Sequence, residues 1–121
     1  MSEENDDYLE FLNEIGLTVK QMSDAAAVST WKDCDSETVQ VGCSEIHGQG
    51  VRAKVDLAPS ESIPAIHQGQ WTQWGRFMNH SKYPNVKPVG NIQNIALVPL
   101  QEIGKGSEVL VNYRDMLACL K

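Results

Sequence analysis

Three short segments, far apart in the 121-residue chain, carry residues able to bind a ligand or transfer a group. The first is His47-Gly48-Gln49-Gly50-Val51, in which two glycines flank a single residue. Such a pair lets backbone amides approach a ligand closely. Taken alone, the pattern is more often a plain turn between strands, and it lacks the third glycine and following helix of a dinucleotide-binding fold.

The second segment runs from Arg76 to Asn85 and contains Asn79, His80 and Ser81 in succession before a proline. This composition favours an ordered turn held by side-chain hydrogen bonds. A histidine here is either buried with both ring nitrogens hydrogen-bonded or part of a catalytic pair with the serine. The sequence indicates no separate acid to complete that pair, which favours the first alternative.

The third segment, from Ile103 to Arg114, is a glycine turn that leads into a strand ending at Tyr113. A phenol at a strand end can position a reacting group. In isolation, however, such a tyrosine more often belongs to the core or its rim.

Hydrophobic periodicity predicts the elements that position these segments. A first helix, N-capped by Asp6 or Asp7 and stopped by Gly16, is expected from apolar residues at helical spacing: Tyr8, Leu9, Phe11, Leu12 and Ile15. A second helix is expected to start at Thr18 or Ser23 and run through 25–27. From Thr38 onward, alternating patterns predict short strands at 39–41, 51–55, near 63, 86–89, 92–98 and 108–111. The sequence therefore predicts an α+β protein, with an acidic helical extension at 1–37 and a mostly β domain at 38–121.

Composition is that of a soluble globular domain, with 41% hydrophobic and 21% charged residues. No apolar run reaches the roughly 18–20 residues of a membrane span. The acidic N-terminus lacks the features of a signal peptide, so an intracellular protein, cytoplasmic or nuclear, is expected. The three cysteines are widely spaced and odd in number, which predicts neither a metal site nor a disulfide framework: Cys34, Cys43 and Cys119.

The net charge of −6 is concentrated in the first third of the chain. Residues 1–38 hold ten acids and two bases, whereas 39–121 hold six acids and eight bases. This distribution argues against a nucleic-acid partner, which needs a concentrated basic face. The acidic helix either attracts a basic partner or packs its apolar side onto the sheet and presents the acids to solvent.

The order and spacing of the three segments resemble the SET-domain family of lysine methyltransferases. The resembling patterns are H-G-x-G-V, R-F-x-N-H-S-x-x-P-N and I-x-x-G-x-E-x-x-x-N-Y, which together cover about residues 38–115. In size the chain is similar to the compact, stand-alone viral SET proteins.

The resemblance implies a core of small curled β-sheets, in which the C-terminal segment passes through a loop of the preceding chain as a pseudoknot. It implies S-adenosylmethionine as cofactor and no metal. The turn of His47, Gly48, Gln49 and Gly50 would hold the methionine and ribose end of the cofactor, and Asn79 and His80 its adenine. Arg76 would lie beside the cofactor. Tyr113 would be the catalytic residue, contacting the cofactor and aligning the lysine amine with the methyl group.

Two departures from the family pattern keep an alternative open. The insert between the two conserved halves is short, spanning 64–75, and no aromatic residue or cysteine-rich segment follows Tyr113 to cover an adenine. A degenerate SET module that binds a protein without transferring a methyl group is therefore the main alternative. An unrelated small β protein is the third.

Trp71 and Trp74 are the candidate substrate-binding residues of the short insert. They would line a lysine channel or form the interface of a homodimer, or else belong to the core. The expected substrate is a basic protein or peptide, such as a histone tail, with no nucleic acid or membrane as partner.

Overall fold

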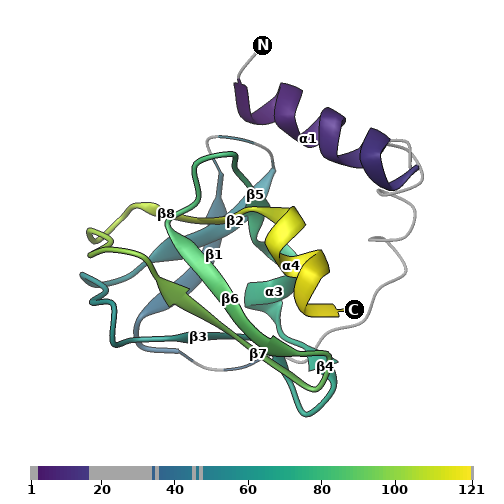
Figure 1. Ribbon diagram of the computed structural model, residues 1–121. Coiled ribbons are helices and arrows are strands. Elements are labelled where there is room, and N and C mark those ends of the chain that lie inside the picture. Colours follow the sequence, from purple (N-terminus) through teal and green to yellow (C-terminus); the bar gives the residue numbers. More distant parts are fainter. Residues whose placement is uncertain (1–2, 17–33, 35, 45, 47, 121) are drawn as a thin grey trace.

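Two four-stranded sheets form the β core, as described by a computed structural model over residues 3–16, 34, 36–44, 46 and 48–120 (Figure 1). The first sheet has the order β1 (Val39–Cys43), β2 (Gln49–Ala53), β8 (Glu108–Val111) and β5 (Asn79–His80). The second has the order β4 (Gln70–Trp71), β3 (Ile63–His67), β7 (Asn94–Pro99) and β6 (Val86–Asn91).

Alternating apolar residues of the strands supply the core. Ile95, Leu97 and Pro99 of β7 are buried, while the two residues between them are half-buried. Val51 of β2 and Val109 of β8 pair across the first sheet, and both are fully buried. Burying each such side chain contributes about 1.5–3 kcal/mol, so the strand pattern itself accounts for much of the driving force.

Strand β8 holds the C-terminal part of the chain inside the first sheet. It pairs antiparallel with β2 and parallel with β5, which precedes it by a long stretch of sequence. On the β5 side, Asn85 acts like an extra strand residue: its Nδ2 donates to the Glu108 carbonyl at 2.9 Å and its Oδ1 accepts from Leu110 N at 2.8 Å. Strand β8 is therefore held against β2 on one side and against β5 and the loop that follows it on the other, as the predicted pseudoknot requires.

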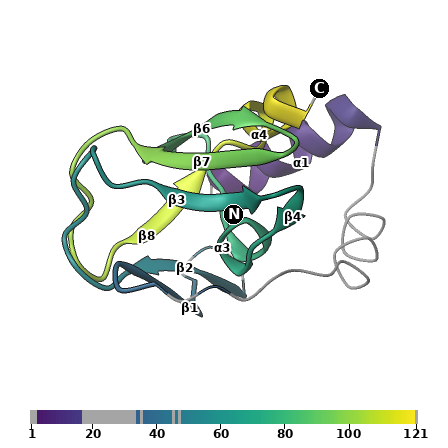
Figure 2. The ribbon, with the colours of Figure 1, turned by 90° about the horizontal axis from the view of Figure 1, so that it is seen from below.

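The described residues also form three helices: α1 (Glu3–Ile15), α3 (Gln73–Phe77) and α4 (Tyr113–Leu120). Helix α3 packs against β3 and the first sheet, and α4 packs against β6. In both ribbon views α1 lies at the same end of the molecule as the start of α4 (Figures 1 and 2). The predicted α+β class is confirmed.

The predicted N-cap of the first helix is wrong. Helix α1 begins at Glu3, so Asp6 and Asp7 lie inside it. The predicted end is confirmed, because Gly16 follows the last helical residue at φ +77°, a left-handed conformation that glycine adopts without steric strain. The second predicted helix lies outside the described residues.

Several strand boundaries differ from those predicted. Strand β2 begins at Gln49 and ends at Ala53, and β7 begins at Asn94 because Ile92 lies in the exposed turn between β6 and β7. The last strand, Glu108–Val111, confirms the alternating pattern at 108–111, but the strand does not extend to Tyr113, which is the first residue of α4. The Asn112 side chain accepts a hydrogen bond from Arg114 N at 3.0 Å, so it caps this helix and stops the strand.

Within the described residues, none of the helices has both the length and the apolar composition that a membrane crossing needs.

Candidate functional site

Strand pairing brings the three segments identified in the sequence to one place. The parallel register sets His80 opposite Val111, two residues before Tyr113. From the other side, the Asn79 side chain donates to the carbonyl of Gln49, in the glycine turn, at 3.0 Å. The glycine turn, the Asn79–His80 pair and Tyr113 therefore form a single cluster, which we call the candidate site.

Tyr113 is anchored at both its backbone and its hydroxyl. Its hydroxyl donates to the Met78 carbonyl at 2.7 Å, and its backbone N–H donates to His80 Nδ1 at 3.0 Å. Burial, together with the nearby Tyr8, raises the pKa of Tyr113, while the positive charge of Arg76 opposes the rise. The phenol therefore stays protonated at neutral pH, as a hydrogen-bond donor fixed next to a backbone carbonyl.

His80 is buried, with 4% of its surface exposed, and both ring nitrogens have partners. Because Nδ1 accepts from Tyr113 N, a neutral ring carries its proton on Nε2, which then donates to Asp7 Oδ2 at 2.6 Å. This is the first of the two alternatives that the sequence offered, a buried histidine with both ring nitrogens hydrogen-bonded. Ser81 is also buried, and its hydroxyl accepts from Tyr83 N at 3.0 Å, as expected of a turn rather than a nucleophile.

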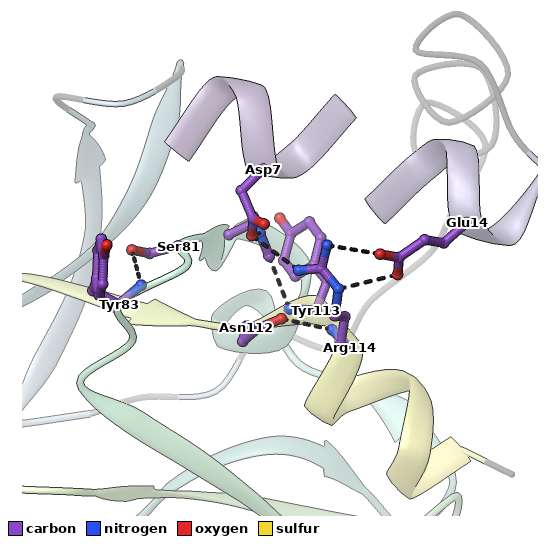
Figure 3. Close-up of polar contacts among 8 residues, drawn as sticks. Asp7, Glu14, Ser81, Tyr83, Asn112, Tyr113 and Arg114 are labelled. Atoms are coloured by element: carbon purple, nitrogen blue, oxygen red, sulfur yellow. Dashed lines mark hydrogen bonds and ion pairs between the residues drawn. The ribbon is translucent and has the colours of Figure 1, made fainter. Parts of the chain in front are cut away.

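Helix α1 is tied to the candidate site by ion pairs (Figure 3). Arg114, at the start of α4, donates to Asp7 at 2.9 Å and to Glu14 at 3.0 and 3.2 Å. Burial of the Asp7 carboxyl acts to raise its pKa, but hydrogen bonds from Arg114 and His80 outweigh this and lower it overall. Hydrogen bonds with Glu14 and Asp7 raise the pKa of Arg114. Two acids of the helix are therefore engaged within the protein.

Aromatic side chains of α1 also pack against the candidate site. Phe11 stacks on the His80 ring with 5.9 Å between centroids, and Tyr8 meets the Tyr113 ring edge-on at 5.8 Å. Phe11 and Leu12 are buried, whereas Leu9 is 41% exposed. The apolar side of α1 thus packs onto the protein through Phe11 and Leu12, and Leu9, expected on that side, faces solvent.

Docking of α1 is expected to weaken in acid. Because the pKa of Asp7 is lowered in the folded protein, its ionised form stabilises the fold above the ordinary value of 3.8, and this contribution is lost as pH falls through the lower folded value. Thermal melting followed by circular dichroism, from pH 6 to about 2, should show this loss. An Asp7→Asn variant should lack this component, and an unchanged acid profile in that variant would contradict the assignment.

The glycine turn brings backbone against side chains of the candidate site. Gly48 has φ +52°, and its carbonyl accepts from Ser44 N at 2.8 Å to close the turn. A Cβ on Gly50 would lie 2.5 Å from Glu108 Oε2 and 3.0 Å from Asn79 Nδ2. Glycine lets these side chains approach the backbone without displacement, so the turn forms a cradle of backbone and polar groups. His47 lies outside the described residues.

Replacing Gly50 with alanine is expected to displace Glu108 and Asn79. The added methyl group meets the ends of side chains, so the free energy of unfolding should fall by only about 1–2 kcal/mol. Ligand binding in the cradle should fall much more, by about tenfold or greater. Gly42, the register partner of Gly50 in β1, is a matched control because a Cβ there meets nothing within 4 Å. Equal binding by Gly50→Ala and Gly42→Ala would refute the cradle.

The remaining predicted residues lie around this cluster. Arg76 is in α3, with its guanidinium 5.0 Å from the Phe77 ring centroid, and its charge acts on Tyr113. Trp74 belongs to the hydrophobic core at 5% exposure, and Trp71 is half-buried and packs against that core. These positions favour the core role for Trp74; a role of either tryptophan in substrate binding or dimerisation stays a prediction.

Sequence reasoning missed four residues that shape the candidate site: Asp7, Met78, Asn85 and Glu108. Met78 contributes a backbone carbonyl, for which no residue type is a signal. Asn85 lies in the recognised motif, and its pairing with β8 depends on tertiary contact.

The sequence analysis also missed the helix that begins at Tyr113. This helix was detectable from Asn112 as an N-cap and from Met116, Leu117 and Leu120 at helical spacing.

Among the described residues, no group of three histidine, cysteine or acidic side chains could hold a metal ion.

Comparisons with known proteins bear on the family and the fold. The family model described as the SET domain matches residues 4–114. Among solved structures, the protein is similar to a crystal structure of a "putative histone methyltransferase" from Plasmodium falciparum. The TM-score is 0.50 at 20% sequence identity, and the match covers 65% of this chain and 95% of that one. At this identity the likeness shows the fold alone.

No curated protein matches the sequence significantly. The predicted boundary between 37 and 38 stays a prediction, since neither comparison tests it. The family model extends over nearly the whole sequence, from α1 to the residue after Tyr113. The chain belongs to the SET-domain family.

Proposed function

We propose that this protein is a protein-lysine N-methyltransferase that uses S-adenosylmethionine, the cofactor SET-domain methyltransferases generally use. The observation that carries the proposal is the hydrogen bond of 2.7 Å from the Tyr113 hydroxyl to the Met78 carbonyl, beside the glycine turn and the Asn79–His80 pair. It sets a neutral phenol oxygen and a carbonyl oxygen side by side, both able to contact an electron-poor methyl group.

The residues present suit this cofactor. Gly50 lets the ends of the Glu108 and Asn79 side chains lie against the backbone of the turn, so polar groups gather where the cofactor would bind. Gln49, Asn79 and Met78 offer carbonyl oxygens, and the Tyr113 ring offers an electron-rich face to a cation. When bound, S-adenosylmethionine supplies a methyl group carried on a positively charged sulfur.

The chain's own residues would provide alignment rather than acid–base chemistry. Methyl transfer to an amine is an in-line displacement, whose rate depends strongly on the alignment and distance of the reacting atoms. The Tyr113 hydroxyl and Met78 carbonyl are fixed relative to each other, so they can orient an amine and a methyl group together. Burial around Tyr113 excludes water, and this loss of hydration disfavours the charged ammonium form of a lysine, which helps it to react as the neutral amine.

The proposed substrate is a lysine in a basic protein or peptide, such as a histone tail. Residues 1–38 carry ten acids and two bases, which favours encounter with a cationic partner. Asp7 and Glu14 are already paired with Arg114, so the remaining acids would provide this attraction.

One observation favours the degenerate module as a second candidate. Tyr8 and Phe11 of α1 pack against Tyr113, on the ring that a reacting lysine would approach. A degenerate module of this kind would bind a protein partner through the SET fold without transferring a methyl group.

Two measurements separate these functions. Calorimetric titration with S-adenosylmethionine should show saturable binding for a methyltransferase, and no heat at millimolar cofactor would contradict the proposal. Transfer of a radiolabelled methyl group to basic peptides and to proteins of a cell lysate tests the chemistry. Cofactor binding with no transfer to any of these substrates would favour the degenerate module.

A further inference from the structure

The carboxylate of Glu108 lies at the glycine turn, in contact with two other segments of the chain. Ser44 Oγ is 2.9 and 2.7 Å from its two oxygens, and Asn79 Nδ2 is 3.0 Å from Oε2. The same oxygen would be 2.5 Å from a Cβ on Gly50. A half-buried negative charge is therefore placed in the cradle where we propose that the cofactor binds.

Glu108 also sets the direction of the Asn79 amide. One N–H of Asn79 donates to the Gln49 carbonyl and the other to Glu108, both at 3.0 Å. Both hydrogen bonds use Nδ2 as the donor, so the amide nitrogen of Asn79 faces the glycine turn and the carboxylate.

The charge of Glu108 also acts on Tyr113. It is one of the smaller contributions that raise the pKa of Tyr113, after burial and the nearby Tyr8. The methyl donor and the product of a transfer differ in one charge: the donor has a sulfonium and the product a neutral thioether. A fixed carboxylate distinguishes these two ligands by Coulomb attraction alone.

We propose that Glu108 is a specificity-determining residue of the cofactor site, which favours the cationic methyl donor over the neutral product. This inference rests on the proposed function and adds to it the means by which product is exchanged for fresh donor. Ser44 and Asn79 hold the carboxylate in place, and Gly50 leaves it room.

The test compares the affinities of S-adenosylmethionine and S-adenosylhomocysteine, measured by calorimetry on the unaltered protein and on Glu108→Gln. The amide keeps the size of the side chain and one acceptor oxygen for Asn79 Nδ2, its NH2 group can donate to Ser44 Oγ, and the charge is removed. We expect the preference for the donor over the product to fall about tenfold. Glu102→Gln is the matched control, since it removes the same charge from an exposed side chain and should leave the ratio unchanged.

The outcomes are distinct. A parallel loss of both affinities in Glu108→Gln would show a structural role and overturn this inference alone. Absence of binding of either ligand to the unaltered protein would overturn the proposed function and the inference with it.

Should Glu108→Gln not fold, the unaltered protein still provides a test. Sinefungin, which carries a protonated amine in place of the sulfonium, should bind more tightly than S-adenosylhomocysteine. Equal affinities for sinefungin, donor and product would refute charge selection.

Discussion

Replacing Tyr113 with phenylalanine is expected to lower methyl transfer about 10- to 100-fold while leaving affinity for S-adenosylmethionine within about twofold. Phenylalanine keeps the ring that packs against Tyr8, Phe11 and His80 but removes the hydroxyl that donates to the Met78 carbonyl at 2.7 Å. The amine and the methyl group would then lose their shared point of alignment. Single-turnover transfer to a basic peptide and calorimetric titration with cofactor measure the two effects separately.

A second tyrosine provides the control for this experiment. Tyr83 is 62% exposed, and Tyr83→Phe should transfer methyl groups at the unaltered rate. A changed number of methyl groups per lysine in Tyr113→Phe would also agree with an alignment role. If both Tyr113→Phe and Tyr113→Ala keep full activity, the assigned role is wrong.

The Asp7→Asn substitution is expected to lower the free energy of unfolding by about 2–4 kcal/mol. The side chain of Asp7 is only 8% exposed and accepts hydrogen bonds from His80 at 2.6 Å and Arg114 at 2.9 Å. Removing its charge leaves a guanidinium without a carboxylate at this position, and a buried histidine facing an amide. Urea denaturation followed by circular dichroism gives the loss for the whole protein, and hydrogen exchange of the α1 amides gives it for the helix.

The same substitution should reach the candidate site through His80. The His80 ring that donates to Asp7 also accepts from Tyr113 N at 3.0 Å. Weakening the hydrogen bond to Asp7 therefore frees the ring to move and weakens its hydrogen bond with Tyr113. Methyl transfer is therefore expected to fall together with stability. Glu10 is exposed on the same helix. Glu10→Gln should change the free energy of unfolding by no more than about 0.5 kcal/mol and should leave the rate of methyl transfer unchanged. Identical denaturation midpoints for the two variants would mean that α1 is not held by this ion pair.

These contacts change how the N-terminal third is understood. The sequence predicted an acidic helix that either attracts a partner or packs on the sheet, and its acids were expected to face solvent in the second case. Instead, Asp7 is buried and Glu14 is bound to Arg114, so α1 forms part of the candidate site. Phe11 and Tyr8 also supply aromatic surface near Tyr113, where the residues after Tyr113 offer none.

Much of the candidate site was predictable because its chemistry depends on residue type and order. Glycines at 48 and 50, the Asn79–His80 pair and Tyr113 were recognised by residue type and spacing, and together they predicted the family and the convergence of three segments. Strand positions followed from alternating apolar residues, which report only on one face of a strand. Strand ends were less accurate, since they depend on turn contacts such as the Asn91 side chain with Gln93 N at 2.9 Å.

The sequence by itself determined the family, the α+β class and the residues around which the site is built, because side-chain chemistry and periodicity are local properties of the chain. Tertiary structure alone decided the rest. It paired Asp7 with His80 across 73 positions, placed Glu108 against Gly50 and chose the Met78 carbonyl as the partner of Tyr113. Such contacts join residues with no fixed spacing, or use backbone atoms that every residue has, so no sequence pattern encodes them.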